Sequence, residues 1–234
     1  MDARIGQALA RSRVYHLLST AYLYPDQELF SQIGDGLFLK GLRDGLSCLS
    51  EMALDALEES LKGLTLTDLQ SEHRRVFGHT ISKDCPPYET QYGATHIFQQ
   101  VQEMGDIGGF YRAFGLEVSE GAKERLDHIS VELEFMHFLC FKEAHALKNH
   151  GEDKAEVCRE AQRKFVKDHL GRWVPTFTRQ LIKKAERGFY KELAVLTGKF
   201  LVLECSLLNV RPEEVKGVIP YTFEPEGECF SCGV

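Results

Sequence analysis

The stretch 120–149 carries the densest set of ionisable side chains in the sequence. Its members are Asp127, His128, Glu132, Glu134, His137, Glu143 and His145. Glu134 and His137 form a Glu-x-x-His pair, the spacing by which one helix offers two ligands to a carboxylate-bridged di-metal centre. Such a centre needs a second Glu-x-x-His pair on a facing helix, and the sequence has no second copy. A metal-dependent helical-bundle enzyme using Glu134 and His137 is therefore kept as the alternative interpretation.

Asp127, His128 and Glu132 also have the spacing of a hydrogen-bonded group. His128 and Glu132 share a face on a helix, and a hydrogen bond between them favours the charged imidazole. Asp127 lies about 100° around the same helix from His128. From the spacing alone, these three residues could have either a structural or a functional role.

Two cysteines near the end of the chain, Cys229 and Cys232, have the spacing of half a zinc site or of a redox pair. His79 and Cys85 are candidates for the remaining zinc ligands. A single Cys-x-x-Cys at a chain end is also typical of a flexible tail with incidental cysteines. We treat Cys229 and Cys232 as weak metal candidates only.

The segment Cys85-Pro86-Pro87-Tyr88 interrupts the helical pattern in the middle of the chain. Two successive prolines remove backbone donors and restrict the residue before them, so a helix cannot continue through this segment. A proline-rigidified aromatic loop beside an acidic helix is typical of a binding feature. A simple connector between helices is the alternative.

The elements that must position these residues are helices, because apolar residues recur at i, i+3 and i+4 and strand alternation is absent. Thr67 and Gln70 have the spacing of a capping box. The pattern predicts an all-α, single-domain bundle of about ten helices over residues 1–211, with the loop 79–93 between its halves and a C-terminal tail over 212–234. After the first helix, the expected ranges are 26–33, 37–47, 50–62, 66–78, 95–115, 120–149, 153–169, 172–187 and 189–209.

The composition excludes several classes of function. The chain has 234 residues, 43% of them hydrophobic, and a formal net charge of −7. This acidic balance argues against a nucleic-acid binder that coats phosphates and favours cationic partners. No apolar run reaches the roughly 18 residues of a membrane span, and no secretion signal is found, so we expect a cytoplasmic protein without membrane insertion. The sequence also lacks a phosphate loop and a dinucleotide fingerprint, so no cofactor is predicted.

Three blocks of sequence together resemble the TorD/DmsD/NarJ family of redox-enzyme maturation chaperones. The first block is Glu72-His73-Arg74-Arg75-Val76-Phe77 followed by Cys85-Pro86-Pro87-Tyr88-Glu89-Thr90. The second and most specific is Asp127-His128-Ile129-Ser130-Val131-Glu132-Leu133-Glu134-Phe135-Met136. The third comprises His169-Leu170, Trp173, Pro175 and Phe189-Tyr190. The resemblance extends over residues 10–210.

This resemblance implies an all-helical cytoplasmic chaperone that is not an enzyme. Members of the family bind the twin-arginine signal peptide and the apo catalytic subunit of a molybdenum-cofactor oxidoreductase, and hold it until cofactor insertion permits export. Carried over by motif position, the implied peptide-binding residues are Val76, Phe77, Pro87, Tyr88, Glu124, Asp127 and His128. Glu132 is added as the residue that holds His128 from the next helical turn.

The chemistry of the expected client peptide agrees with the types of these implied binding residues. A twin-arginine signal offers two guanidinium groups and then an apolar stretch, so its receptor needs carboxylates beside an apolar groove. We expect Glu124 and Asp127, on one helix face, to supply the carboxylates, and the groove to lie between the loop 79–93 and the helix 120–149. The client enzyme stays open, as does the choice between a monomer and a domain-swapped dimer.

Overall fold

The computed structural model describes residues 2–78, 84–93, 97–117, 124–185 and 188–217. These residues form ten α-helices: α1 (Ala3–Ala21), α2 (Gln27–Gly34), α3 (Leu37–Ser47), α4 (Asp55–Leu61), α5 (Leu66–Phe77), α6 (Ile97–Ala113), α7 (Ile129–Asn149), α8 (Glu152–Phe165), α9 (Gly171–Ala185) and α10 (Phe189–Leu208). The described residues also form a 3₁₀ turn at Glu89–Gln91 and a π-helical turn at Val166–Leu170. The predicted all-α class is confirmed.

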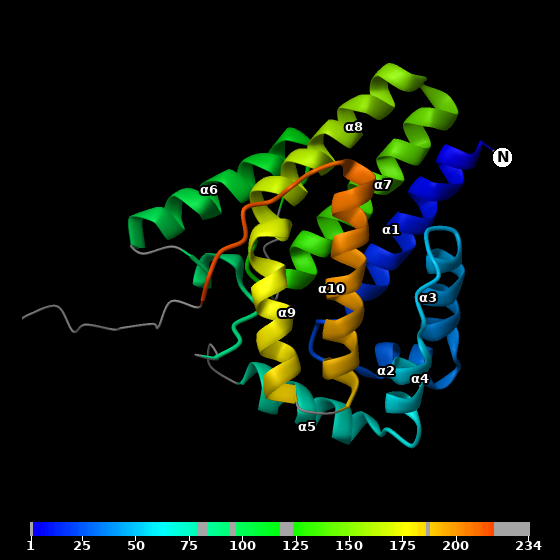
Figure 1. The fold of residues 1–234 in the computed structure, drawn as a ribbon, viewed down its shortest axis with the longest axis vertical. Coiled ribbons are helices and arrows are strands. Elements are labelled where there is room, and N and C mark those ends of the chain that lie inside the picture. The colour runs from blue at the N-terminus through cyan, green and yellow to red at the C-terminus, as the bar shows by residue number, and fades with distance from the viewer. Residues whose placement is uncertain (1, 79–83, 94–96, 118–123, 186–187, 218–234) are drawn as a thin grey trace, which may run out of the picture.

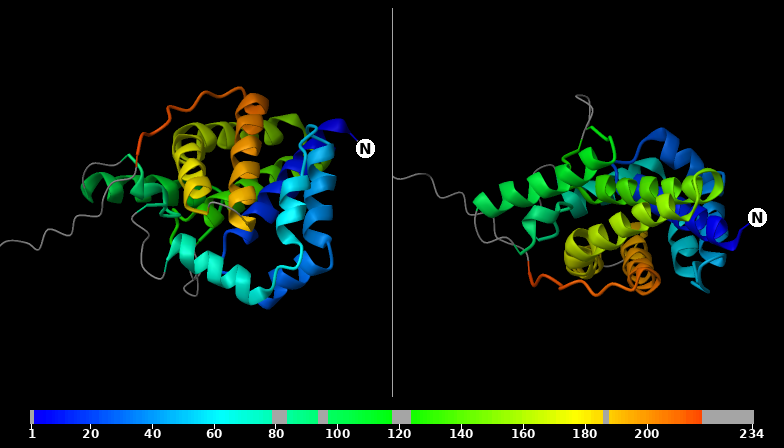
Figure 2. Two further views of the ribbon diagram at one scale, coloured as in Figure 1. Left: turned by 60° about the horizontal axis from the view of Figure 1, so that its bottom comes forward. Right: turned by 90° about the horizontal axis from the view of Figure 1, so that it is seen from above.

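The helices α1 and α7 form the central pair of the bundle (Figure 1). Ser12 contacts His137 and Ser19 contacts Glu134, so the two helices run antiparallel. The helices α9 and α10 form a second pair that packs across the first, and α2–α4 lie at the far side of α1. The helix α5 closes one end of the bundle, and α6 projects on the side opposite α2–α4 (Figure 2).

Aromatic side chains fill the space between the two helix pairs. Trp173 and Phe177, four residues apart on α9, both face inward, and their ring centroids are 5.4 Å apart. Phe177 stacks on Phe77 of α5, and Tyr15 of α1 meets Phe200 of α10 edge to face. Burial of these rings contributes apolar contacts that hold the helices together. None of the helices in the described ranges combines the length and apolar character that crossing a membrane requires.

The cap predicted for one helix and the start predicted for another are wrong. The helix α5 begins with a capping box made by Thr65 and Asp68 rather than by Thr67 and Gln70. The predicted helix 120–149 begins only at Ile129, with His128 as its N-cap. The residues just before it, 124–128, use their backbone groups to pair with the loop 84–93 instead of continuing the helix.

The predicted break between the helices 153–169 and 172–187 is absent, because the π-helical turn joins α8 to α9 without a loop. The last described residues, 209–217, then run back along α9 (Figure 1). Val215 N donates to Arg172 O over 2.9 Å, and Thr176 Oγ1 donates to Val215 O over 2.7 Å. We call residues 209–217 the strap.

Gly171 is the closest point between the strap and α9. A Cβ atom at this position would lie 2.2 Å from Pro212 Cγ and 2.4 Å from Val166 O. We expect Gly171→Ala to lower the free energy of unfolding by about 1–3 kcal/mol, because either the strap or the π-helical turn must shift.

The matched control is Gly105→Ala in α6, where an added Cβ meets no atom within 4 Å. This change is expected to raise stability by up to about 1 kcal/mol through helix propensity. Urea unfolding of both variants measures the difference. Equal stability of the two variants would contradict the close packing at Gly171.

Candidate functional site

The loop 84–93 is hydrogen-bonded to the residues that precede α7. Tyr88 and His128 form an isolated antiparallel bridge. Ile129 N donates to Pro87 O over 2.8 Å, and Glu89 N donates to Asp127 O over 2.9 Å. The structure therefore brings together Pro87, Tyr88, Asp127 and His128, which the sequence motifs had placed far apart in the chain.

The Asp127 carboxylate is fully buried and is used within the chain. Arg125 Nε donates to Oδ1 over 3.0 Å and Arg125 Nη2 to Oδ2 over 2.9 Å, while Thr90 Oγ1 donates to Oδ2 over 2.7 Å. The expectation that Asp127 and Glu124 share a helix face is wrong, because both precede the helix. Asp127 instead locks the loop 84–93 onto the start of α7.

His128 is buried, which favours the neutral imidazole. Ser130 N donates to His128 Nδ1 over 3.2 Å, so the imidazole caps the helix α7. Its ring packs against Tyr88 with centroids 5.2 Å apart. Burial, with smaller contributions from His73 and Arg125, lowers the pKa of His128 to about 3. The expected charged imidazole is therefore wrong.

A buried neutral histidine makes stability depend on pH. The pKa of His128 falls from 6.5 in the unfolded chain to about 3 in the folded one, so only the unfolded chain takes up the proton between these values. The free energy of unfolding is therefore unaffected by the titration of His128 above about pH 6.5. As the pH falls below this value, the free energy of unfolding decreases by about 1.4 kcal/mol per pH unit. Glu124, Arg125 and His73 face the imidazole.

We expect His128→Asn to flatten the loss of stability between pH 6.5 and pH 4.5, because asparagine retains an N-cap acceptor but does not titrate. Urea unfolding at several pH values measures this slope. The slope above pH 7 provides the internal control and should match that of the unmodified chain. An unchanged slope below pH 6 would contradict the neutral, buried state of His128.

Glu132 lies beneath the loop and does not contact the His128 side chain, which corrects the expected pair. Trp173 Nε1 donates to Glu132 Oε2 over 3.0 Å, and the carboxyl group is fully buried. Burial and the neighbouring Glu89 raise the pKa of Glu132 well above its ordinary value, which favours the neutral acid. Glu89 in turn lies 3.1 Å from His169 Nδ1. These groups support the loop from inside the fold.

Tyr88 and Glu124 are the predicted site residues that reach the surface. Tyr88 is half-buried, and its hydroxyl donates to Glu124 Oε2 over 3.4 Å. The Arg125 guanidinium lies 4.8 Å from the centre of the Tyr88 ring. Burial raises the pKa of the Glu124 carboxyl. Glu124 is thus held in place by Tyr88 while it keeps a face open to solvent.

Val76 and Phe77, at the end of α5, are core residues. Their exposed fractions are 0% and 6%, so neither presents a surface to a ligand. The Phe77 ring packs against Tyr22, Phe177 and Tyr190. These two residues position the end of α5 rather than form the walls of a groove.

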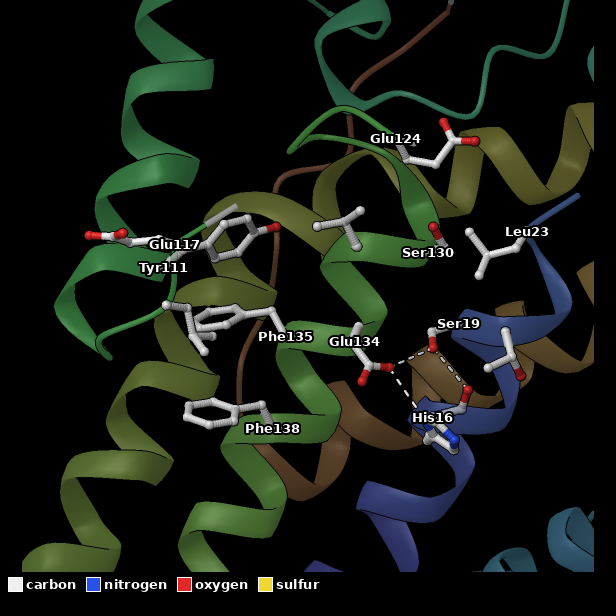
Figure 3. A pocket seen from close by; sticks show the side chains of 13 residues that line it. His16, Ser19, Leu23, Tyr111, Glu117, Glu124, Ser130, Glu134, Phe135 and Phe138 are labelled. Carbon is white, nitrogen blue, oxygen red and sulfur yellow. Dashed lines mark hydrogen bonds and ion pairs between the residues drawn. The ribbon is translucent and has the colours of Figure 1, made fainter. Parts of the chain in front are cut away.

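A cavity of about 550 Å³ opens beside this junction (Figure 3). It is lined by His16, Ser19, Thr20, Leu23, Tyr111, Leu116, Glu117, Glu124, Ser130, Val131, Glu134, Phe135 and Phe138. Of the sequence-predicted site residues, Glu124 lines the cavity. No described residue of the loop 84–93 lines it, so the cavity lies between α1, α7 and the end of α6 rather than along the expected loop groove.

Sequence reasoning missed most of the cavity. Ser19 comes from the last turn of α1 and Leu23 from the residues just after it, and Phe135 and Phe138 come from α7 (Figure 3). Leu23 is an apolar side chain that is 39% exposed, and this exposure is seen only in the fold, so no signal in the sequence indicated it. Three carboxylates, Glu117, Glu124 and Glu134, are part of an otherwise largely apolar lining. The arrangement suits a ligand that combines positive charge with apolar groups.

The candidate zinc ligands Cys229, Cys232 and His79 lie outside the described residues. Cys85 is buried, and burial raises the pKa of its thiol to about 12, which disfavours the thiolate that binds zinc. Glu134 lies at the cavity and points toward α1, where it accepts a hydrogen bond from Ser19 Oγ over 2.8 Å (Figure 3).

Comparison with known proteins identifies the family. The model of the nitrate reductase delta subunit family matches residues 44–179, more than half of the chain. The chain belongs to this family. A relative from Dechloromonas aromatica, a perchlorate reductase assembly chaperone protein, is 32% identical over 85% of this chain and 89% of its own length. A selenate reductase assembly chaperone protein from Thauera selenatis is 44% identical over 77% of this chain and 81% of its own.

Two further similar proteins extend the comparison. Chaperone protein TorD from Photobacterium profundum is 26% identical over 85% of this chain and 94% of its own length. A solved structure from Archaeoglobus fulgidus, described as a redox enzyme maturation protein, shares the fold with a TM-score of 0.51 at 21% identity, covering 82% of this chain and 93% of its own. The resemblance to the TorD/DmsD/NarJ family is confirmed. These curated relatives are all named as chaperones, so the chain is a member of a chaperone family.

Proposed function

We propose that this chain is a cytoplasmic maturation chaperone for a molybdenum-cofactor reductase. It binds the twin-arginine signal peptide of the apo catalytic subunit, keeps that subunit competent for cofactor insertion and delays its export until insertion is complete. The observation that carries this proposal is the largely apolar cavity whose lining includes Glu117, Glu124 and Glu134.

The cavity complements both parts of such a signal. Guanidinium groups form charge-assisted hydrogen bonds with carboxylates, and these are strongest where water is partly excluded. Glu124 is half-buried, so its carboxylate meets this condition. The apolar stretch that follows the arginines would pack against Leu23, Val131 and Phe138. The volume of about 550 Å³ is within the usual range of ligand pockets.

The sequence-predicted residues divide into two roles in this proposal. Tyr88 and Glu124 contact the peptide directly, since they are the ones that reach the surface. The remaining residues position them from within the fold: Val76, Phe77, Pro87, Asp127, His128 and Glu132. Asp127 is the most important of these, because it holds the loop of Tyr88 against the start of α7.

The relatives suggest the class of client. Two of those named above are assembly chaperone proteins of perchlorate and selenate reductases, and another relative, from Ideonella dechloratans, is a chlorate reductase assembly chaperone protein. We therefore propose that the client is the catalytic subunit of a molybdoenzyme that reduces an oxyanion. Such a client is met before export, which places the encounter in the cytoplasm.

Isothermal titration calorimetry with a synthetic twin-arginine signal peptide from a selenate reductase catalytic subunit tests the proposal. We expect 1:1 binding that weakens as salt is raised, because exposed charges are screened. Replacing both arginines of the peptide with glutamine should abolish most of the affinity. Capture of the full catalytic subunit together with equal capture of a subunit lacking its signal would show that the chaperone recognises another part of the client.

A further inference from the structure

We propose that His16, Glu134 and His137 form a binding site for a divalent transition-metal ion of the zinc class. The site joins α1 to α7 at the edge of the cavity and is separate from any catalytic role. It uses the single Glu-x-x-His pair of the sequence together with a third ligand that only the fold supplies.

The three side chains converge from two helices. One potential ligand atom from each of them lies within 4.8 Å of the others, a spacing that a single ion can span with small rotations of the side chains. The His16 and His137 rings have centroids 4.9 Å apart, and Glu134 Oε2 lies 3.3 Å from His16 Nδ1. Figure 3 shows Glu134 reaching from α7 toward His16 on α1.

Hydrogen bonds outside the cluster already orient two of the ligands. His137 Nδ1 donates to the backbone carbonyl of Ser12 over 2.9 Å, which leaves Nε2 as the nitrogen with a free lone pair. Metal-binding histidines usually donate their second ring nitrogen to such an acceptor. Glu134 accepts a hydrogen bond from Ser19 Oγ over 2.8 Å, which fixes the carboxylate in the same way.

The ligand set selects the class of metal. Two imidazoles and one carboxylate match the three protein ligands of open zinc sites, with the fourth position left to water. Magnesium and calcium prefer all-oxygen ligand sets, so they are poor competitors here. The His16 and Glu134 side chains are 49% and 51% exposed, so an ion can enter without any opening of the fold.

Zinc titration of the full chain carrying Cys229→Ser and Cys232→Ser tests this inference, because the two substitutions remove the competing terminal thiols. Calorimetry should show one saturable zinc ion per chain, and thermal unfolding should shift upward by a few degrees with zinc but not with magnesium. His16→Gln and Glu134→Gln should each weaken zinc binding by at least about tenfold. Both residues are half-exposed, so these variants are expected to fold.

His145→Gln is the matched control, because His145 is exposed on the same helix but lies outside the cluster. It should bind zinc as the parent does. Cobalt substituted for zinc should give a visible spectrum typical of nitrogen and oxygen ligands without a thiolate band. Absence of saturable zinc binding, or unchanged affinity in both His16→Gln and Glu134→Gln, would overturn the proposal.

Discussion

Replacing Arg11 with alanine is expected to lower the free energy of unfolding by about 3–5 kcal/mol, because it leaves a buried carboxylate without its counter-ion. Arg11 forms a two-pronged ion pair with Glu204: Nε donates over 2.7 Å and Nη2 over 2.6 Å. The side chains of Arg11 and Glu204 are 5% and 0% exposed. Tyr15 Oη donates to the same carboxylate over 2.9 Å. We expect this hydrogen bond to be disturbed as well when Arg11 no longer holds the Glu204 carboxylate in place.

The effect is large because the group connects four helices. Arg11 of α1 also lies 3.5 Å from Glu143 of α7, which accepts a hydrogen bond from Gln162 of α8 over 2.9 Å, while Glu204 belongs to α10. Removing the guanidinium therefore disturbs the contact of both helix pairs at once. Urea unfolding followed by circular dichroism measures the loss.

Arg13→Ala is the matched control for this prediction. Arg13 lies on the same helix, and its ion pair with Asp44, at 3.7 Å, joins side chains that are 56% and 50% exposed. An exposed pair of this kind contributes less than about 1 kcal/mol. A similar loss in Arg11→Ala and Arg13→Ala would show that burial of the Arg11–Glu204 pair does not set its importance.

Replacing Glu124 with glutamine is expected to weaken binding of the twin-arginine peptide by about 10- to 100-fold, the size of one hydrogen bond to a charged group. Glutamine retains the shape of the side chain and an acceptor for Tyr88, so the cavity should remain intact. The salt dependence of binding should become shallower as well, since one ion pair is lost. Calorimetric titration at two salt concentrations measures both effects.

The control for charge alone is Glu160→Gln, which removes an exposed carboxylate of α8 that does not line the cavity. This variant should bind the peptide as the unmodified chain does. Tyr88→Phe, which removes the hydroxyl that donates to Glu124, should cause a smaller loss. If Glu124→Gln and Glu160→Gln had the same affinity, the net charge rather than the cavity would be responsible for recognition.

Most helices could be predicted from the sequence because amphipathic periodicity is a local property. The ranges 37–47 and 189–209 match α3 and α10 to within one residue. The start of α7 could not be predicted in this way, because the order of apolar and polar residues over 124–128 is compatible with a helix. What stops the helix is the pairing of Asp127 with Glu89 and Thr90, a contact between residues nearly forty positions apart.

The candidate site was predicted in part. The motif residues Tyr88, Asp127 and His128 do come together, but their environments differ from those expected. Whether a histidine is charged depends on burial and on neighbours such as His73, and neither can be read from spacing on one helix. The ion pair between Arg125 and Asp127 was not predicted, because sequence spacing does not show which carboxylate an arginine side chain meets.

The sequence by itself determined the helical class, the proline loop, the acidic balance and the motifs of the chaperone family, since these depend on residue type and short spacing. Only the tertiary structure decided where a ligand could bind. The cavity and the cluster of His16, Glu134 and His137 both require α1 to pack beside α7, which joins residues more than a hundred positions apart. Such pairings result from burial of whole helix faces, and no local pattern encodes them.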